Sequence, residues 1–366
     1  MRFHVLGIPH TASNSDWMCC AFTQKVVKLC AMLKGLGHYV IHYGNAASSV
    51  VCDESVSVTE PNELEPPAKY LEFDIGSALY RTFFERAIAA IAKRKQRHDF
   101  LLCMWGSGHK PVADAHPDLL VVEPGIGYVA GHFAPFKVFE SYAILHAYFG
   151  LNFMAGGDKG GWYDVVIPNC FEPGDFRFEP DKDDYLLFLG RVNSGKGIHI
   201  ALEVAAAADV PIVVAGPGEY ATSYRKAVFV GIVNQQTRAE LLARARALIA
   251  PSMFAEPFCG VVTEAHFSGT PTITTDWGAF AENNLHGLTG YRCRTFEHLL
   301  WAVGNTHKIS PQHCRAWAQD NFSVERVAVM YDEFFYSVMN VARGHGWYQP
   351  NNNRRHLSWL ERVYPS

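Results

Sequence analysis

The sequence predicts an α/β protein made of two consecutive domains, each a parallel sheet covered by helices. Apolar runs of strand length alternate with helix-length patterns, and this alternation restarts after a break near the middle of the chain. A length of 366 residues suits two domains of ordinary size. With 49% hydrophobic and 19% charged residues, the chain has the composition of a folded protein. Disordered, collagen-like and coiled-coil classes are therefore excluded.

The first half opens with a strand, a helix and a second strand. Residues 3–6 form a short apolar run, residues 20–36 have a helical pattern, and residues 39–43 form the next apolar run. Gly37 follows the helix as glycine commonly does at a C-terminal cap. Neighbouring parallel strands need such a crossover, so this unit predicts a parallel sheet. The pattern continues with a helix over 78–95 and strands over 100–105 and 119–122.

A composition break at residues 168–184 divides the chain, because Pro, Gly, Asp and Glu crowd there as they do in exposed linkers. We therefore expect domains over 1–170 and 171–330. Strands are predicted over 185–189, 211–215, 228–230, 247–250 and 271–274, and helices over 198–208, 237–245 and 261–268. Two consecutive α/β sheets predict a ligand cleft between them, outside the carboxyl ends of the strands.

The tail over residues 331–366 begins with an amphipathic helical pattern. Its first turns carry four aromatic residues: Tyr331, Phe334, Phe335 and Tyr336. Rings of this size need a surface on which to dock. We expect the tail to pack back on the first domain.

Charge and cysteine usage narrow the functional classes. A formal net charge of -4 gives no overall field that attracts nucleic acid. Nine cysteines without a CxxC pair fit neither a disulfide framework nor a zinc ribbon, so reduced thiols are expected. The N-terminus lacks a signal-peptide pattern, and no stretch approaches the ~18 apolar residues that span a bilayer. These features predict a soluble, cytoplasmic protein without a transmembrane segment.

The strongest chemical signal is a glycine-rich loop with two cations between a predicted strand and a helix. The loop contains Gly190, Arg191, Gly195, Lys196 and Gly197. Unpaired amides at a helix N-terminus and fixed positive charge both favour phosphate, so a diphosphate is the natural occupant. The loop is not a Walker A motif, because glycine rather than Ser or Thr follows the lysine. Alone, the loop would more often be a solvated turn with two surface cations.

Two further motifs accompany this loop. A tight turn containing Gly216 closes the next strand, and Glu256 and Glu264 lie eight residues apart, before and within a helix start. This spacing suits two different parts of one elongated ligand. A helix-capping role for Glu256 is the alternative reading. Three amides at the helix start are predicted to donate to sugar hydroxyls or phosphate: those of Phe258, Cys259 and Gly260.

Together these motifs resemble the retaining glycosyltransferases of family 4, also described as glycosyl transferases group 1. The resemblance covers residues 167–291, including the turns at 269–271 and 287–290 and the segment 277–282. It implies the GT-B fold, in which two Rossmann-like domains face each other across a deep interdomain cleft. It also implies that Arg191 and Lys196 bind the donor diphosphate, that Glu256 binds the transferred sugar, and that Glu264 binds the nucleotide ribose.

One residue of the donor half departs from the family pattern. Cys259 stands where family members usually carry glycine. If that position needs a positive φ, cysteine adds steric strain, unless Gly260 supplies the freedom instead.

The first half matches the family less well. His10 and Thr11 occupy the place of the usual glycine pair after the first strand. His109 follows the strand over 100–105, where an acceptor-side histidine often stands in this fold, and His116 and His132 are weaker rivals. A glycine-relaxed loop with Gly127 and Tyr128 is typical of an acceptor site, with an interdomain turn as the alternative.

The resemblance implies transfer of a hexosyl or pentosyl group from a nucleotide sugar, with UDP-sugars favoured, to a hydroxyl acceptor with retention of configuration. It implies no cofactor and no metal, and no DxD-type acidic cluster adjoins the diphosphate loop. A glycan or small hydroxylated acceptor is favoured over a modified base in DNA, because a negative net charge does not attract the phosphate backbone of a DNA duplex. The alternatives are a non-catalytic nucleotide-sugar-binding module and a phosphorylase or epimerase of the same fold. The donor base, the acceptor and the oligomeric state stay open.

Overall fold

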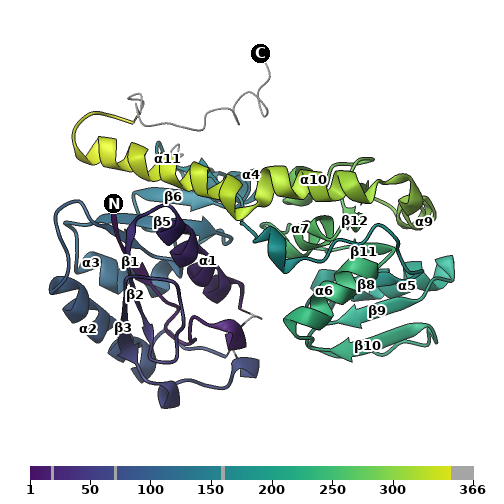
Figure 1. Cartoon of the computed structure of the whole chain (residues 1–366), viewed down its shortest axis with the longest axis horizontal. Helices are drawn as coiled ribbons and strands as arrows, with labels where there is room; N and C mark the ends of the chain where they lie inside the picture. The colour runs from purple at the N-terminus through teal and green to yellow at the C-terminus, as the bar shows by residue number, and fades with distance from the viewer. Residues whose placement is uncertain (18–19, 70–71, 158–160, 348–366) are drawn as a thin grey trace. The chain divides into compact units, whose positions relative to one another are not determined.

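The computed structural model describes residues 1–17, 20–69, 72–157 and 161–347 (Figure 1). It contains two compact units. Among the described residues, the first unit comprises those within 1–139, 148–167 and 327–347, and the second comprises residues 140–147 and 168–326. The part of the expected tail beyond residue 347 lies outside the described residues.

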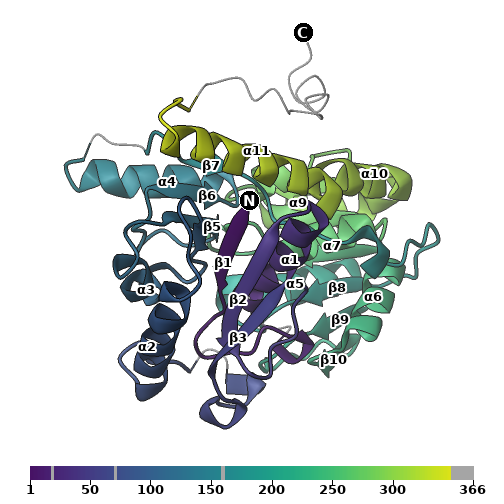
Figure 2. The same ribbon diagram turned by 60° about the vertical axis from the view of Figure 1, so that its left-hand side comes forward.

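The described part of the first unit holds a seven-stranded parallel sheet in the order β3-β2-β1-β4-β5-β6-β7. Its strands are β1 Arg2–Leu6, β2 Tyr39–Asn45, β3 Glu54–Thr59, β4 Phe100–Leu102, β5 Leu120–Ile126, β6 Phe136–Phe139 and β7 Val165–Val166. Its helices are α1 Ala21–Gly35, α2 Ala78–Ala92, the short α3 Lys110–Asp114, and the greater part of α4 Tyr142–Met154. Figure 2 shows α2 and α3 lying side by side, and both pack into one apolar cluster with the sheet.

Local sequence explains these elements. In α1 the buried side chains of Val26, Leu29, Cys30 and Leu33 recur at the spacing of one helix face. The helix ends where Gly37 adopts a φ of 78°.

The last long helix, α11 (Val324–Ala342), contributes an aromatic side chain to the core of the first unit. The Phe335 ring lies 4.7 Å from Phe3 on β1 and 5.2 Å from Phe100 on β4. The buried face of the helix therefore completes the core beside these two strands.

The second unit holds a six-stranded parallel sheet in the order β10-β9-β8-β11-β12-β13 among the described residues. Its strands are β8 Leu186–Leu189, β9 Ile212–Ala215, β10 Ala227–Gly231, β11 Ala247–Ala250, β12 Thr272–Thr275 and β13 Gly290–Cys293. Its helices are α5 Ile198–Ala208, α6 Gln235–Arg244, α7 Gly260–Phe267, α8 Phe280–Asn283, α9 Phe296–Asn305 and α10 Pro311–Phe322. Helices α5 and α9 contribute to one apolar cluster, and α6 and α7 to another.

The predicted α/β class with two parallel sheets is confirmed. Helix α5 and strand β11 have the predicted bounds. The strand expected over 100–105 is shorter, because Trp105 already precedes a 3-10 turn. The start of α4 also belongs to the second unit, where the Glu282 carboxylate accepts hydrogen bonds from the Tyr142 and Ala143 amides, each at 2.8 Å.

Candidate functional site

The loop between β8 and α5 forms the centre of the candidate site. Gly190 follows β8 with a φ of 152°, and Gly197 precedes α5 with a φ of 75°. A Cβ on Gly197 would lie 2.1 Å from the carbonyl oxygen of Pro251, so this position requires glycine on two counts. The Asn193 side chain accepts the Lys196 amide at 2.9 Å. The loop is therefore held at the N-terminus of α5 by backbone packing and by a local cap.

The turn after β9 packs directly on this loop. Gly216 has a φ of 139°, and a Cβ there would meet the carbonyl oxygen of Gly190 at 1.9 Å. The Gly190 amide donates to Ala215 at 2.9 Å, and the Val192 amide donates to Pro217 at 2.8 Å. Gly216 therefore permits a close approach of two backbones, which explains the glycine in the predicted turn.

Lys196 and Glu256 form an ion pair at this loop. The Lys196 Nζ lies 2.7 Å from Glu256 Oε1, and the Ser252 hydroxyl donates to the same oxygen. The carboxylate side chain is only 3% exposed, whereas that of Lys196 is 22% exposed. The Lys196 ammonium also lies 4.9 Å from the centre of the Phe254 ring. The two residues predicted to bind the diphosphate and the sugar are thus brought together.

Arg191, which lies on the same loop as Lys196, is exposed. Within the described part of the chain, its guanidinium makes no ion pair or hydrogen bond. The loop therefore offers one cation that is already paired and one that is available to an anion.

Cys259 adopts the left-handed conformation with φ 64° and ψ 69° at the N-cap of α7. Gly260, the first residue of α7, is not among the positive-φ glycines, so it does not supply the conformational freedom. The cysteine itself carries the strain that the sequence anticipated. Burial, and then the nearby Glu256 charge, raise the pKa of the Cys259 thiol, which keeps it protonated and a poor nucleophile.

The alternative reading of Glu256 as a helix cap is not what the structure shows, because Cys259 is the N-cap residue of α7 and Glu256 pairs with Lys196. Phe258, predicted at the donor site, is 4% exposed and stacks on Phe171 with ring centres 6.3 Å apart. Its side chain therefore belongs to an apolar cluster, which leaves only its backbone to serve a ligand.

Glu264 lies one turn into α7 and pairs with Arg238 of α6. Arg238 Nε donates to Glu264 Oε2 at 2.7 Å, and the Glu264 side chain is 13% exposed. The sequence reasoning did not find Arg238. A cation on the polar face of a helix carries no signal of a partner 26 residues away.

In the first unit, His109 has no exposed surface. Its Nε2 hydrogen-bonds the Gly7 carbonyl at 3.0 Å, its ring stacks on Phe83, and burial lowers its pKa to about 3. In this placement the ring holds the backbone that follows β1. Direct contact with an acceptor stays a prediction for this residue.

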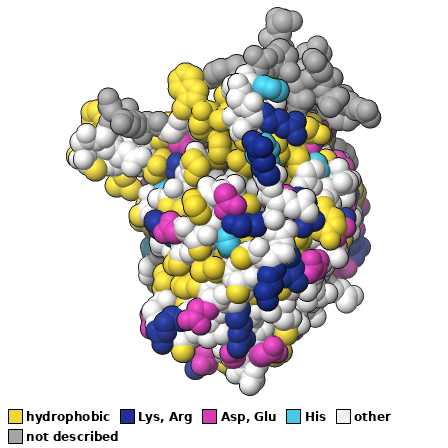
Figure 3. Space-filling model, turned by 90° about the vertical axis from the view of Figure 1, so that its left-hand side faces the viewer, with side chains coloured by type: hydrophobic (Ala, Val, Ile, Leu, Met, Phe, Trp, Pro, Cys, Tyr) yellow, Lys and Arg dark blue, Asp and Glu magenta, His cyan; other side chains and the backbone are white. Residues whose placement is uncertain are grey.

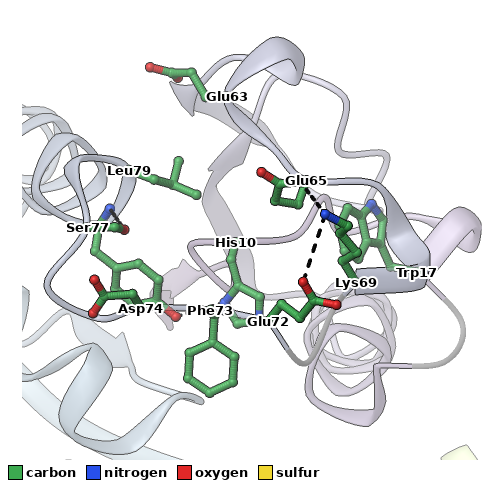
Figure 4. A pocket seen from close by; sticks show the side chains of 11 residues that line it. His10, Trp17, Glu63, Glu65, Lys69, Glu72, Phe73, Asp74, Ser77 and Leu79 are labelled. Carbon is green, nitrogen blue, oxygen red and sulfur yellow. Dashed lines mark hydrogen bonds and ion pairs between the residues drawn. The ribbon is translucent and has the colours of Figure 1, made fainter.

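His10 and Thr11 lie in the loop after β1, and both are buried. His10 Nδ1 is 2.8 Å from the Tyr80 hydroxyl, and the Thr11 hydroxyl is 2.7 Å from that of Thr23. His10 also lines a pocket of the first unit (Figure 4).

The predicted loop with Gly127 and Tyr128 is half-buried. The Tyr128 hydroxyl donates to Glu123 at 3.3 Å, and this fully buried carboxylate also accepts two backbone amides. Burial raises the pKa of Glu123. The weaker rival His132 stacks on Tyr128, and burial lowers its pKa to about 4, whereas His116 is buried.

Among residues 1–17, 20–69, 72–157 and 161–347, no group of three or more His, Cys, Asp or Glu side chains is arranged to hold a metal ion. None of the helices in the same ranges is both long enough and apolar enough to span a bilayer.

Residues 175–303 match the model of the family described as Glycosyl transferases group 1. An uncharacterized glycosyltransferase of Methanocaldococcus jannaschii is 31% identical over 124 residues, which is 30% of this chain and 32% of that protein. The D-rhamnosyltransferase WbpZ of Pseudomonas aeruginosa is 29% identical over 117 residues, or 29% of this chain and 31% of that protein. Each match spans about a third of the relative's length.

Three solved structures resemble nearly the whole chain. The glycosyltransferase AviGT4 of avilamycin A biosynthesis has a TM-score of 0.65 at 21% identity, covering 94% of this chain and 98% of its own. Sucrose-phosphate synthase from Thermosynechococcus elongatus has a TM-score of 0.69 at 16% identity, covering 93% and 99%. HepE of Anabaena, in complex with UDP and glucose, has a TM-score of 0.66 at 15% identity, covering 92% and 100%. These similarities confirm the GT-B fold.

Proposed function

We propose that this chain is a retaining glycosyltransferase that moves a hexosyl or pentosyl group from a nucleotide sugar to a hydroxyl acceptor. The ion pair between Lys196 and Glu256 at the glycine-framed start of α5 carries this proposal. It places a cation suited to a phosphate beside a carboxylate suited to sugar hydroxyls. The pair lies within residues 175–303, which match a glycosyltransferase family.

The proposed role of Lys196 and Arg191 is to stabilise the departing nucleoside diphosphate. As the anomeric bond breaks, negative charge grows on the phosphate oxygen, and fixed cations there are worth several kcal/mol in the transition state. The amides at the N-terminus of α5 add to this field. The two cations therefore act on the leaving group rather than on the acceptor.

Glu256 would accept hydrogen bonds from the transferred sugar. Retention without a protein nucleophile is consistent with the high pKa of the neighbouring Cys259 thiol. The leaving phosphate oxygen would then take the acceptor proton on the same face of the sugar. We propose that this reaction needs no metal, and equal turnover with EDTA and with added Mg²⁺ or Mn²⁺ is the expected result.

We propose a UDP-sugar as the donor, with Glu264 as the acceptor of ribose hydroxyl hydrogen bonds. The solved structure of HepE with UDP and glucose supports this choice by similarity of fold. Glu264 is suited to the role because Arg238 holds one of its oxygens, which fixes the orientation of the carboxylate.

For the acceptor, we propose a glycan or a small hydroxylated compound. The face of the molecule drawn in Figure 3 mixes acidic and basic side chains, unlike the basic surface that tracks a DNA backbone. A modified base in DNA is therefore the less favoured acceptor. Incubating the protein with hydroxymethylated DNA and a labelled donor would reveal that activity directly.

Thermal unfolding in the presence of UDP, GDP, ADP and their sugars tests the donor side, because a ligand that binds the native state raises its stability. We expect the largest shift with UDP compounds, followed by slow hydrolysis of one UDP-sugar. The strained Cys259 favours one second candidate, a binding module without transfer. Tight binding with no hydrolysis or transfer would establish that candidate, and no binding at all would refute both.

A further inference from the structure

A pocket of about 200 Å³ lies in the first unit, beside the loop that follows β1. It is formed by that loop, by residues from the segments 63–69 and 72–74, and by residues at the start of α2. Figure 4 shows the side chains that line it. They are His10, Trp17, Glu63, Glu65, Lys69, Glu72, Phe73, Asp74, Ser77, Leu79 and Tyr80.

Aromatic rings form one wall of this pocket. The Phe73 ring stacks on His10 with centres 4.6 Å apart and an interplanar angle of 19°, and Phe73 is 39% exposed. Trp105 Nε1 donates to the Tyr80 hydroxyl at 2.9 Å, and that hydroxyl is 2.8 Å from His10 Nδ1. An indole N–H can only donate, so the Tyr80 oxygen accepts it, and the same hydroxyl forms a second hydrogen bond with His10 Nδ1. These hydrogen bonds fix the orientation of the His10 ring, and therefore the surface on which Phe73 stacks.

The charged side chains around the wall have an acidic surplus. Four carboxylates line the pocket, whereas Lys69 is the one lysine or arginine among the described residues that line it. Lys69 lies 3.6 Å from Glu65 and 3.9 Å from Glu72, and Glu63 is 3.7 Å from Arg86 outside the lining. Asp74 has no cationic partner among the described residues; its Oδ1 accepts the amide of Gly76 at 2.8 Å.

We propose that this pocket binds the acceptor, and that the acceptor is a hydroxylated ring compound carrying a protonated amine, such as an amino sugar. A ring packs against the fixed aromatic wall, and an ammonium gains from both the aromatic face and the surplus carboxylates. The same charges disfavour a phosphate-bearing acceptor. The assignment to an acceptor rests on the proposed function, whereas the binding chemistry of the pocket does not.

The test compares glucosamine with N-acetylglucosamine, which share the ring but differ in the charge on nitrogen. Saturation-transfer NMR on the full chain is expected to show glucosamine binding at least threefold more tightly at low salt. The preference should shrink at high salt, since screening weakens exposed charge interactions. UDP binding is measured separately by thermal unfolding and reports on the donor side. If UDP binds and glucosamine does not, the pocket proposal fails while the proposed function stands.

Variants connect this preference to the pocket. Asp74→Asn keeps the oxygen that accepts the Gly76 amide but removes one charge, and should weaken glucosamine binding about threefold. Phe73→Leu should weaken both sugars, and Glu203→Gln on the exposed face of α5 is the charge-matched control. Equal binding of the two sugars, binding of neither, or unchanged binding by the Asp74 and Phe73 variants would overturn the proposal. UDP shifts like those of the wild type would show that each variant is folded.

Discussion

Replacing Lys196 by methionine tests the donor site most directly, because it removes the charge and keeps most of the apolar stem. Glu256 then loses the donor at 2.7 Å and keeps the Ser252 hydroxyl on a carboxylate side chain that is 3% exposed. Losing one partner of a fully buried ion pair costs ~3–5 kcal/mol. We expect about 2 kcal/mol of destabilisation, because the Lys196 side chain is 22% exposed and already partly hydrated. Turnover should fall about 10²- to 10³-fold, the effect of losing one transition-state donor.

A second substitution separates stability from catalysis. In the double variant Lys196→Met with Glu256→Gln, the buried position is neutral and the Ser252 hydroxyl can still donate to it. We expect most of the lost stability to return, while turnover stays at least about 10²-fold below that of the wild type. Arg191→Met is the matched control, since that exposed guanidinium has no partner among the described residues and its loss should lower turnover without lowering stability.

The assays are urea unfolding, followed by tryptophan fluorescence, and release of UDP during transfer. The denaturation midpoint is compared between variants, because a two-unit chain need not unfold in one step. Transfer by Lys196→Met within threefold of the wild type would refute the catalytic assignment. A double variant no more stable than the single one would refute the electrostatic account of the pair.

Three further outcomes follow from the geometry. Cys259→Gly should raise stability by up to about 1 kcal/mol in urea unfolding, because relief of the positive φ outweighs the added chain entropy, and a loss would contradict the strain. Gly216→Ala should abolish the thermal shift with UDP, because its Cβ would collide with the Gly190 carbonyl. Gly304→Ala, at an exposed position of α9, is the control and should leave the thermal shift unchanged. UDP binding by the Gly216 variant would contradict the close approach of the two backbones. Burial lowers the pKa of His42 to about 4, so its contribution to stability is complete above about pH 6.5 and is lost as the pH falls towards 4. His42→Gln should flatten the pH dependence of the stability measured by urea unfolding over this range. An unchanged slope would mean that other groups cause this pH dependence.

The sequence predicted the elements of the second unit from β8 to β12 closely, because their signals are local. Strands such as β11 are short apolar runs, and glycines such as Gly197 and Gly216 mark turns that only glycine can make. Local signals of this kind depend on backbone sterics within a few residues. They identify the loop where Lys196 lies without any knowledge of tertiary contacts.

The errors concern long-range contacts. Strand β3 is missed because its residues 54–59 alternate in burial at the edge of a sheet, and polar residues interrupt its apolar run. The hydrogen bond between His109 Nε2 and the Gly7 carbonyl leaves no signal in the sequence, because the two residues are 102 positions apart. Arg238 is missed for the same reason. A residue whose role depends on a contact far along the chain produces no local or periodic pattern in the sequence.

The contact between Lys196 and Glu256 also constrains how a donor would bind. In the described structure the two opposite charges neutralise each other, so a diphosphate must take the Lys196 ammonium from a carboxylate that is almost wholly buried. A nucleoside diphosphate alone leaves Glu256 with only Ser252 as a hydrogen-bond donor, whereas a nucleotide sugar brings hydroxyls that replace the lost ammonium. Under the proposed function, the exchange itself would therefore favour binding of the complete donor over binding of the product. Under the proposed function, the same exchange would draw Lys196 towards the bond that has to break, so one buried carboxylate would link recognition of the sugar to the electrostatics of the leaving group.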